Sequence, residues 1–381
     1  MPAQPRILIL TVDAGFGHRS AANALAAAFE SLYGDSCAIV VANPFDSPTT
    51  PRWLRNTQSD YDKIARKMPE VYRLGFDLSD RAVARRAMEN AMSAFLLQSV
   101  RDTIAEARPD AIISTFPLYL PALATLAKTE KRRIPVVTVL TDLVRMHQTW
   151  FNPVSDITIV PNEIVRDLAI SSGLEAAGIE VVGIPVHPEL SQGSRDRADL
   201  RMELGLDPGL TTILAVGSKR VGKLLDVLDV INHSGFPVQL LVVAGGDDTV
   251  YGKLLDIEWH VPARIHNFVR NLPTMMKAAD LVVAKAGGLI VNEALAVGLP
   301  LMLIDILPGQ EVGNAEYVVA NGAGVVVKDA LSCLEQLRHW FGNGGERLAA
   351  MSVNASRLGR PDAAMRIAAR VFALATRSPK T

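Results

Sequence analysis

Short runs of apolar, often β-branched residues alternate along the chain with longer stretches in which apolar residues recur at helical spacing. The short runs are almost continuously apolar, which is typical of parallel strands that helices cover on both faces. A first series of predicted strands lies at 6–12, 37–43, 110–115, 134–141, 156–161 and 179–183. A second series lies at 212–217, 237–244, 263–268, 280–284, 299–304 and 323–327. Two such series predict two doubly wound α/β domains.

The boundary between the two domains is expected near residues 183–194. Pro185 and Pro188 cannot continue a helix or lie in a central strand, and a polar segment follows them. We therefore predict an N-terminal domain at 1–185, a C-terminal domain at 186–360, and a final helix at 361–381 that returns to the N-terminal domain. Two such domains joined by a hinge place a ligand cleft between their strand ends.

Composition and charge narrow the class of protein. The 381 residues include 39 Lys and Arg against 40 Asp and Glu, so the chain lacks the cationic excess of a dedicated nucleic-acid binder. No apolar run approaches the roughly 18–20 residues of a transmembrane helix, and the first one is too short for a signal peptide. Cys37 and Cys333 lie far apart and show no metal-like spacing, which fits a reduced compartment. We expect a cytoplasmic protein without a nucleic-acid partner.

A glycine-rich turn at 13–18 follows the first predicted strand, and an alanine-rich helix begins after it. Glycines allow a ligand to approach the backbone closely, and a helix N-terminus favours anions or developing negative charge. His18 could act as a base near neutral pH. The alternative is a tight turn in which His18 only neighbours the helix cap. Ser20 ends the motif where a dinucleotide fingerprint requires glycine, so a dinucleotide site is not expected.

Polar and aromatic residues also follow the fourth predicted strand, at the edge where His18 is expected. Asp142 comes directly after this strand, and His147, Trp150 and Phe151 follow it. The carboxyl ends of parallel strands are where α/β proteins bind ligands. The alternative is that Asp142 caps a turn and Trp150 packs in the core.

Residues 52–86 differ from both series of strands. Nine basic residues outnumber five acidic ones there, and aromatic residues are interleaved with them. This composition suits contact with an anionic bilayer surface. A solvated helical insertion with its apolar side on the domain fits the same pattern. The candidate acceptor and membrane contacts are Arg52, Trp53, Arg55, Arg66 and Lys67, together with His147 and Trp150.

Three glycine-containing segments of the second half could bind a phosphorylated ligand. Gly217, Lys219 and Arg220 follow the first strand of this half, without the spacing of a nucleoside triphosphatase loop. Gly287 and Gly288 open a helix, and Glu293 lies further along it, where it could accept hydrogen bonds from ribose hydroxyls. An exposed helical glutamate is the alternative for Glu293. The third segment, at 308–314, is a polar loop suited to contacting a sugar.

Taken together, these motifs resemble the inverting GT-B glycosyltransferases that make glycolipids. The closest resemblance is to the monogalactosyldiacylglycerol synthase and processive diacylglycerol glucosyltransferase family, which is related to the lipid I GlcNAc transferase. It covers almost the whole chain and rests on the turn with His18 and on the segments 61–72, 141–151, 183–186, 292–300 and 308–314. It implies two Rossmann-like domains facing across a cleft, a lipid acceptor on the N-terminal domain, a UDP-sugar on the C-terminal domain, and no essential metal.

The resemblance also implies roles for individual residues. It implies that Glu293 binds the ribose and that Gln310 and Glu311 bind the sugar hydroxyls. The diphosphate would be bound by Gly287, Gly288 and Leu289. The uracil would lie beside Phe268 and Val269. The chain departs from the family where Ser218, Lys219 and Arg220 replace a glycine-rich turn with an acidic residue, and where Phe16 replaces a further glycine.

The chemistry implied is direct displacement at the anomeric carbon. A lipid hydroxyl is a poor nucleophile, so a base must take its proton, and Asp13, His18 and Asp142 are the candidates, with His18 favoured. The helix N-terminus at Gly288, with Lys219 and Arg220, would stabilise the departing UDP without a metal.

We therefore expect a hexosyltransferase that acts on a UDP-hexose and diacylglycerol at an anionic membrane surface and forms a β-glycoside. A cytoplasmic enzyme associated peripherally with the cell membrane fits this activity. The alternatives are another UDP-GlcNAc-using GT-B enzyme, either a polyprenyl-lipid transferase or a 2-epimerase, and a non-catalytic protein that binds a UDP-sugar or a lipid.

Overall fold

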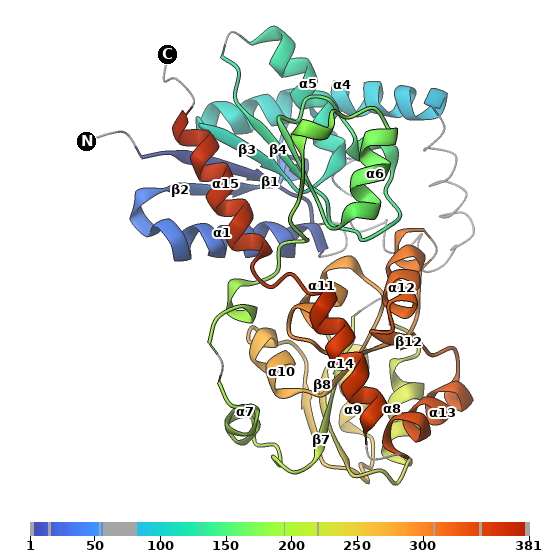
Figure 1. The fold of residues 1–381 in the computed structure, drawn as a ribbon. Coiled ribbons are helices and arrows are strands. Elements are labelled where there is room, and N and C mark those ends of the chain that lie inside the picture. Colours follow the sequence, from blue (N-terminus) through green and yellow to red (C-terminus); the bar gives the residue numbers. More distant parts are fainter. Residues whose placement is uncertain are drawn as a thin grey trace. The chain divides into compact units, whose positions relative to one another are not determined.

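The computed structural model describes residues 4–13, 17–52, 55, 82–130, 132–193, 195–218, 221–307, 309–342 and 345–377. The chain divides into two compact units, which are coloured along the sequence in Figure 1. Unit 1 comprises Met1–Pro188, Pro308–Gln310 and Asp362–Thr381, and unit 2 comprises Glu189–Leu307 and Glu311–Pro361. Each unit contains one parallel sheet of six strands.

The sheet of unit 1 has the strand order β2-β1-β3-β4-β5-β6, and all neighbouring strands are parallel. Its strands are β1 (Arg6–Leu10), β2 (Ala38–Ala42), β3 (Ala111–Ser114), β4 (Val136–Val139), β5 (Ile157–Val160) and β6 (Ile179–Val181). The chain order reverses at β1, which lies between β2 and β3. The carboxyl ends of β1 and β3 therefore flank the topological switch point, where open α/β sheets bind ligands.

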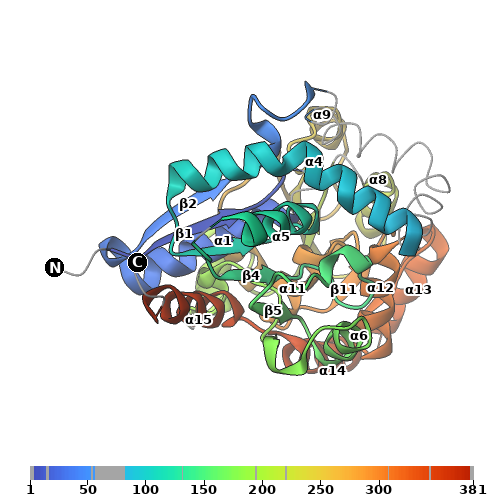
Figure 2. The same cartoon turned by 90° about the horizontal axis from the view of Figure 1, so that it is seen from above.

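Helices cover both faces of this sheet. Its helices in the described part of the chain are α1 (Gly17–Tyr33), α4 (Ala82–Ala107), α5 (Leu120–Thr129), α6 (Glu163–Ser171) and α15 (Ala363–Arg377). In β1, Ile7 and Ile9 pack with α1 and α15, whereas Leu8 and Leu10 pack with α4 and α5. Successive side chains of a strand point to opposite faces, so an uninterrupted apolar run supplies both cores. Figure 1 shows α15 beside α1, and Figure 2 shows α4 beside α5.

The last helix belongs to the core of unit 1 although the second sheet precedes it in sequence. Ile367, Ala368 and Val371 are buried in the same cluster as the residues of α1. Tyr33 of α1 stacks on Phe372 of α15 with ring centroids 3.8 Å apart. The final segment of the chain therefore stabilises the sheet that the first segment begins.

The sheet of unit 2 has the order β12-β11-β10-β7-β8-β9, again with all neighbours parallel. Its strands are β7 (Thr211–Val216), β8 (Val238–Val243), β9 (Ala263–His266), β10 (Leu281–Ala284), β11 (Leu301–Leu303) and β12 (Gly324–Val326). The topological switch point of this unit lies between β7 and β10.

Among the described residues, eight helices lie mostly in unit 2: α7 (Arg197–Glu203), α8 (Leu224–Asn232), α9 (Asp248–Leu255), α10 (Leu272–Ala278), α11 (Gly288–Ala296), α12 (Gln310–Ala320), α13 (Ala330–Phe341) and α14 (Glu346–Leu358). One core lies between the sheet and α8, α9 and α13, and the buried Trp340 of α13 is its largest side chain. Across the described part of both units, short 3-10 turns lie at Gly34–Ser36, Pro44–Asp46, Pro117–Tyr119, Gln148–Trp150, Ala176–Gly178 and Pro188–Leu190.

Both predicted series of strands are confirmed, and so are two Rossmann-like parallel sheets. Most observed strands are shorter than the predicted ones; for example, the run at 299–304 contains the strand Leu301–Leu303. Apolar residues continue beyond the last paired residue of a strand because the flanking segments remain buried. Of the helices in the described part of the chain, none has the length and apolar character to cross a membrane.

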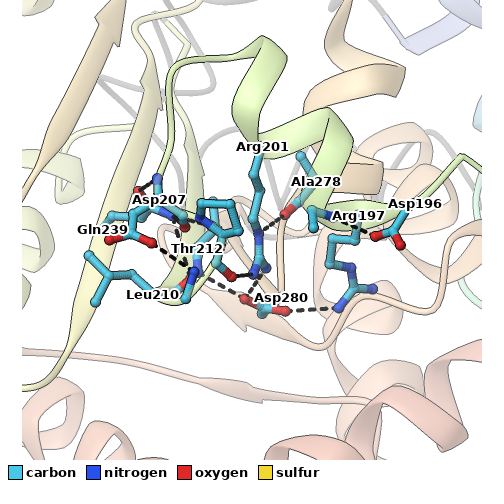
Figure 3. A network of polar contacts seen from close by, with 12 residues as sticks. Asp196, Arg197, Arg201, Asp207, Leu210, Thr212, Gln239, Ala278 and Asp280 are labelled. Carbon is cyan, nitrogen blue, oxygen red and sulfur yellow. Dashed lines mark hydrogen bonds and ion pairs between the residues drawn. The ribbon is translucent and has the colours of Figure 1, made fainter.

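A buried arginine ties the start of unit 2 to its sheet (Figure 3). The guanidinium of Arg201 on α7 donates hydrogen bonds to the carbonyl oxygens of Ala278 and Pro208, at 2.9 and 3.1 Å, and forms an ion pair with Asp280. Asp280 also accepts hydrogen bonds from Arg197 Nη1 and from the Thr212 backbone N–H, both at 2.8 Å. The network lies at the amino ends of β7 and β10, opposite the edge of the switch point.

Candidate functional site

His18 lies in the first turn of α1, directly after the loop that leaves β1. Its Nδ1 is 3.2 Å from Thr141 Oγ1, beyond the end of β4. Its ring packs edge-on against Phe116, with centroids 5.1 Å apart, and is tilted against Trp150 at 6.1 Å. Thr115 Oγ1, after β3, donates to the His18 carbonyl at 3.2 Å. The ends of β1, β3 and β4 therefore meet at this histidine.

Asp13, the second candidate base, forms an ion pair with Arg19. Its Oδ1 accepts from Arg19 Nε at 2.6 Å, and its Oδ2 accepts from Arg19 Nη2 at 3.0 Å and from Asn43 Nδ2 at 3.2 Å. The hydrogen bond from Arg19, above all, lowers the pKa of Asp13 from its usual value. A carboxylate with a lowered pKa is a weaker proton acceptor, which favours His18 over Asp13 as the base.

The third candidate base, Asp142, is half-buried next to Thr141. His147 begins the turn at Gln148–Trp150: its Nδ1 lies 2.8 Å from Thr149 Oγ1 and accepts from the Thr149 backbone N–H. Trp150 is only 4% exposed and packs in a cluster with Met146. The packing alternative for Trp150 therefore holds, and its indole does not lie on the surface as a membrane contact. It remains a neighbour of His18.

The basic segment at 52–86 is described only at its two ends. Arg52 and Arg55 belong to the described residues, whereas Trp53, Arg66 and Lys67 lie outside them. The predicted membrane contact through this segment stays a prediction.

Gly217 and Gly245 bring the ends of β7 and β8 close together. A Cβ on Gly217 would lie 2.9 Å from Leu224 Cδ2 and 3.1 Å from the Ala244 carbonyl oxygen. Gly245 adopts a positive φ of 73°, and a Cβ there would lie 2.2 Å from the Gly217 carbonyl oxygen. Packing alone therefore requires glycine at both positions. Lys219 and Arg220, the cations predicted beside Gly217, lie outside the described residues.

The N-terminus of α11 lies at the switch point of unit 2. Gly287 is the N-cap and supplies no side-chain cap, and the first bond back into the helix runs from the Val291 N–H to the Gly287 carbonyl. The N–H groups of Gly288 and Leu289 precede that bond, so they are available to an anion at this edge.

Glu293 lies on the same helix and is half-buried. Within the described ranges, no group donates a hydrogen bond to its carboxylate. Burial raises its pKa to about 8. A carboxyl that is partly withdrawn from water and has no partner is costly to ionise, and a ligand that offers hydroxyl donors would satisfy it.

Phe268 provides an aromatic surface near the carboxyl end of β9. Its side chain is 70% exposed. A Cβ on Gly246, which has a φ of 76°, would lie 4.0 Å from Phe268 Cδ2. Val269, its neighbour, is half-buried. An exposed ring beside a glycine turn can stack on a planar base.

Glu311, which the resemblance places at the sugar, forms an ion pair within the protein. It is 7% exposed, its Oε1 lies 2.5 Å from Lys285 Nζ, and its Oε2 accepts from the Leu307 N–H at 3.1 Å. Each carboxylate oxygen therefore has one partner within the protein, and the predicted contact of Glu311 with the sugar hydroxyls stays a prediction. Gln310 precedes it as the first residue of α12.

The sequence did not predict two of the contacts at the carboxyl edges of the sheets. Thr141 is the partner of His18, and Lys285 is the partner of Glu311. The only signal for Lys285 was its place between a buried strand and a glycine pair. No group of three or more His, Cys, Asp or Glu residues in the described part of the chain could hold a metal ion.

The chain matches two family models. Residues 18–186 match the model described as monogalactosyldiacylglycerol (MGDG) synthase, and residues 225–367 match the glycosyltransferase family 28 C-terminal domain. The first match contains His18 and Thr141, and the second contains Lys285, Glu293 and Glu311.

Known structures share the fold at low sequence identity. MurG of Acinetobacter baumannii superposes with a TM-score of 0.61 at 15% identity, over 97% of this chain and all of that one. The calicheamicin glycosyltransferase CalG4 gives a TM-score of 0.60 at 16% identity, over 99% and 100% of the two chains. A UDP-GlcNAc 2-epimerase from Neisseria meningitidis gives 0.61 at 13% identity, over 96% and 99%. The GT-B fold is confirmed, and it is common to transferases and epimerases.

Relatives of higher sequence identity distinguish between a transferase and an epimerase. The chloroplastic monogalactosyldiacylglycerol synthase of Spinacia oleracea is 32% identical over 380 residues, which cover 96% of this chain and 72% of the relative. Monogalactosyldiacylglycerol synthase 1 of Arabidopsis thaliana is 30% identical over 378 residues, covering 95% and 69%. The chain therefore belongs to the monogalactosyldiacylglycerol synthase family of glycosyltransferases.

Proposed function

We propose that this protein transfers a hexose from a UDP-sugar to diacylglycerol, with inversion, and so forms a β-glycolipid. The relatives are named as monogalactosyldiacylglycerol synthases, which supports diacylglycerol as the acceptor and galactose as the sugar. The observation that carries the proposal is Glu293, a half-buried carboxyl with a raised pKa and no partner among the described residues, on the helix that begins at the switch point of unit 2.

On the donor side, the Glu293 carboxylate accepts hydrogen bonds from the ribose hydroxyls, and Phe268 stacks on the uracil. The N–H groups of Gly288 and Leu289 bind the diphosphate, with the positive end of the α11 dipole behind them. These donors stabilise the negative charge that develops on UDP as it leaves. We propose that no metal ion is required.

On the acceptor side, His18 is the proposed base. The acceptor hydroxyl gives its proton to the His18 ring as its oxygen bonds to the anomeric carbon. The bond from that carbon to the β-phosphate oxygen breaks, and UDP departs with the electron pair. Thr141 Oγ1, at 3.2 Å from Nδ1, orients the ring.

Diacylglycerol resides in a bilayer, so the enzyme must reach a membrane surface. We propose that it does so peripherally from the cytoplasmic side, through the basic and aromatic residues of 52–86. The net positive charge of this segment supports attraction to anionic lipids.

A donor panel tests the function. UDP-galactose, UDP-glucose and UDP-GlcNAc are incubated with the enzyme and diacylglycerol in anionic vesicles, and products are identified by mass spectrometry. We expect monogalactosyldiacylglycerol, UDP release only when diacylglycerol is present, and unchanged rates in EDTA. Epimerisation of UDP-GlcNAc without lipid would show a 2-epimerase instead. UDP-sugar binding without any turnover would show a binding protein.

The raised pKa of Glu293 predicts that nucleoside affinity depends on pH. In the free protein the pKa is about 8, so the carboxyl is mostly protonated at pH 6 to 7. Ribose hydroxyls donate to the ionised form, so binding lowers this pKa and releases a proton. Affinity for uridine, which carries no titrating phosphate, should therefore rise about tenfold from pH 6 to pH 7 and level off above pH 8.

Calorimetry of uridine binding at several pH values measures this dependence. Glu293→Gln should bind uridine weakly and equally at every pH, whereas a change at an exposed glutamate of α13, Glu335→Gln, should behave as wild type. A wild-type affinity that does not change between pH 6 and pH 8 would remove Glu293 from the ribose site.

A further inference from the structure

The Lys285–Glu311 pair lies at the switch point of unit 2. Lys285 is the first residue after β10, and Glu311 is in the first turn of α12. Their side chains are 18% and 9% exposed, and the Nζ–Oε1 distance is 2.5 Å. A nearly buried ion pair at the carboxyl edge of the central strands is placed where a ligand would contact it.

The ammonium of Lys285 lies against the N-terminus of α11. A Cβ built on Gly287, the N-cap, would be 3.1 Å from Lys285 Nζ and 3.4 Å from its Cε. A cation beside the positive end of a helix is electrostatically unfavourable unless an anion compensates both charges. Within the protein Glu311 compensates one of them, while the first-turn N–H groups of α11 have no side-chain cap.

Hydrogen bonding leaves the lysine able to bind a ligand. An ammonium group has three donors, and among the described residues its one partner is Glu311. The carboxylate of Glu311 is held in turn by the Leu307 N–H at 3.1 Å. Nearby, Asn314 Nδ2 on the same helix donates to the Ala286 carbonyl at 3.0 Å, which fixes α12 to the loop that carries Lys285.

We propose that Lys285 binds the diphosphate of the donor and that Glu311 is a positioning residue, which holds the Lys285 ammonium beside the N-terminus of α11. This inference rests on the proposed function. It differs from the sugar contact implied by the resemblance in that Glu311 acts on the ligand through Lys285, with which its Oε1 is paired.

Comparing three ligands separates these roles. Uridine, UDP and UDP-galactose are titrated by calorimetry into wild type, Lys285→Met and Glu311→Gln. We expect Lys285→Met to weaken UDP binding at least tenfold, in keeping with the loss of a charge-assisted hydrogen bond, and to leave uridine binding unchanged. Glu311→Gln should weaken UDP binding in the same direction. The Glu311→Gln effect should vanish in the Lys285→Met background, since the glutamate acts through the lysine.

Matched controls are available in the same unit. Lys253→Met on α9 and Glu335→Gln on α13 change exposed residues of the same types and should leave all three affinities unchanged. If either single variant fails to fold because an unpaired charge remains buried, the double variant Lys285→Met/Glu311→Gln removes both charges. It should bind uridine normally and UDP weakly.

Three outcomes would overturn the inference in different ways. Unchanged UDP affinity in Lys285→Met, or in the double variant, removes the lysine from the diphosphate site. A Glu311→Gln variant that loses affinity for UDP-galactose but not for UDP shows that Glu311 contacts the sugar directly. Failure of the wild-type enzyme to bind either uridine or UDP overturns the proposed function itself.

Discussion

His18→Ala is expected to lower turnover with diacylglycerol by about 10²–10⁴-fold, while UDP affinity stays at the wild-type value. The size of this decrease in turnover follows from the loss of general base catalysis, because a lipid hydroxyl is a poor nucleophile until its proton is removed. UDP affinity is unaffected because the proposed donor contacts all belong to unit 2. Initial rates in the vesicle assay give turnover, and calorimetry gives UDP affinity.

Three further substitutions identify the base. Asp13→Asn should reduce turnover much less than His18→Ala, since Arg19 holds the Asp13 carboxylate and its pKa is lowered. Thr141→Val should have a smaller effect than His18→Ala, as it removes only the contact that orients the ring. The ascending limb of the pH–rate profile should disappear only in the variant that lacks the base. If Asp142→Asn abolishes turnover while His18→Ala retains it, Asp142 is the base.

The architecture was predictable from the sequence because parallel strands need apolar residues on both faces. Ile7 and Leu8 are adjacent in sequence and enter separate cores on opposite sides of the sheet. Neither residue could be replaced by a polar one without disturbing one of the two layers. An uninterrupted apolar run is therefore a strong signal, and all twelve runs became strands.

The positions of the candidate sites followed from the same topology. Strand ends that are far apart in sequence meet at one edge of a parallel sheet, so His18 and Thr141 come together although 123 positions separate them. The local pattern specified only that each residue follows a strand. The strand order, which sets their distance, is a property of the folded sheet.

Side-chain partners could not be predicted in this way. Lys285 and Glu311 are 26 positions apart, and their contact depends on how α12 begins after β11. Glu311 therefore had the sequence pattern of a sugar ligand and the environment of a buried ion pair. The role of Gly217 was equally hidden from the sequence. A glycine after a strand suggests a ligand, whereas the close approach of Gly217 to Gly245 already explains why glycine is needed there.

Asp280→Asn is expected to destabilise unit 2 by about 3–5 kcal/mol. Its carboxylate is the ion-pair partner of Arg201, whose side chain is 9% exposed, and it also accepts from Arg197 and the Thr212 N–H. Removing the carboxylate's charge leaves the Arg201 guanidinium buried without a counter-charge, and this desolvation cost dominates the loss of the individual hydrogen bonds. Urea unfolding followed by tryptophan fluorescence measures the effect, because Trp259 and Trp340 both belong to unit 2.

A neighbouring exposed pair provides the control for this prediction. Glu203, also on α7, pairs with Arg195 at 2.5 Å, but both side chains are more than half exposed, so Glu203→Gln should cost less than about 1 kcal/mol. The double variant Arg201→Met/Asp280→Asn should recover part of the stability, since it removes the uncompensated charge. The network lies at the amino ends of β7 and β10, so the folded variants should bind UDP as wild type does. A loss in Asp280→Asn no larger than that in Glu203→Gln would mean that water, rather than Asp280, compensates the guanidinium.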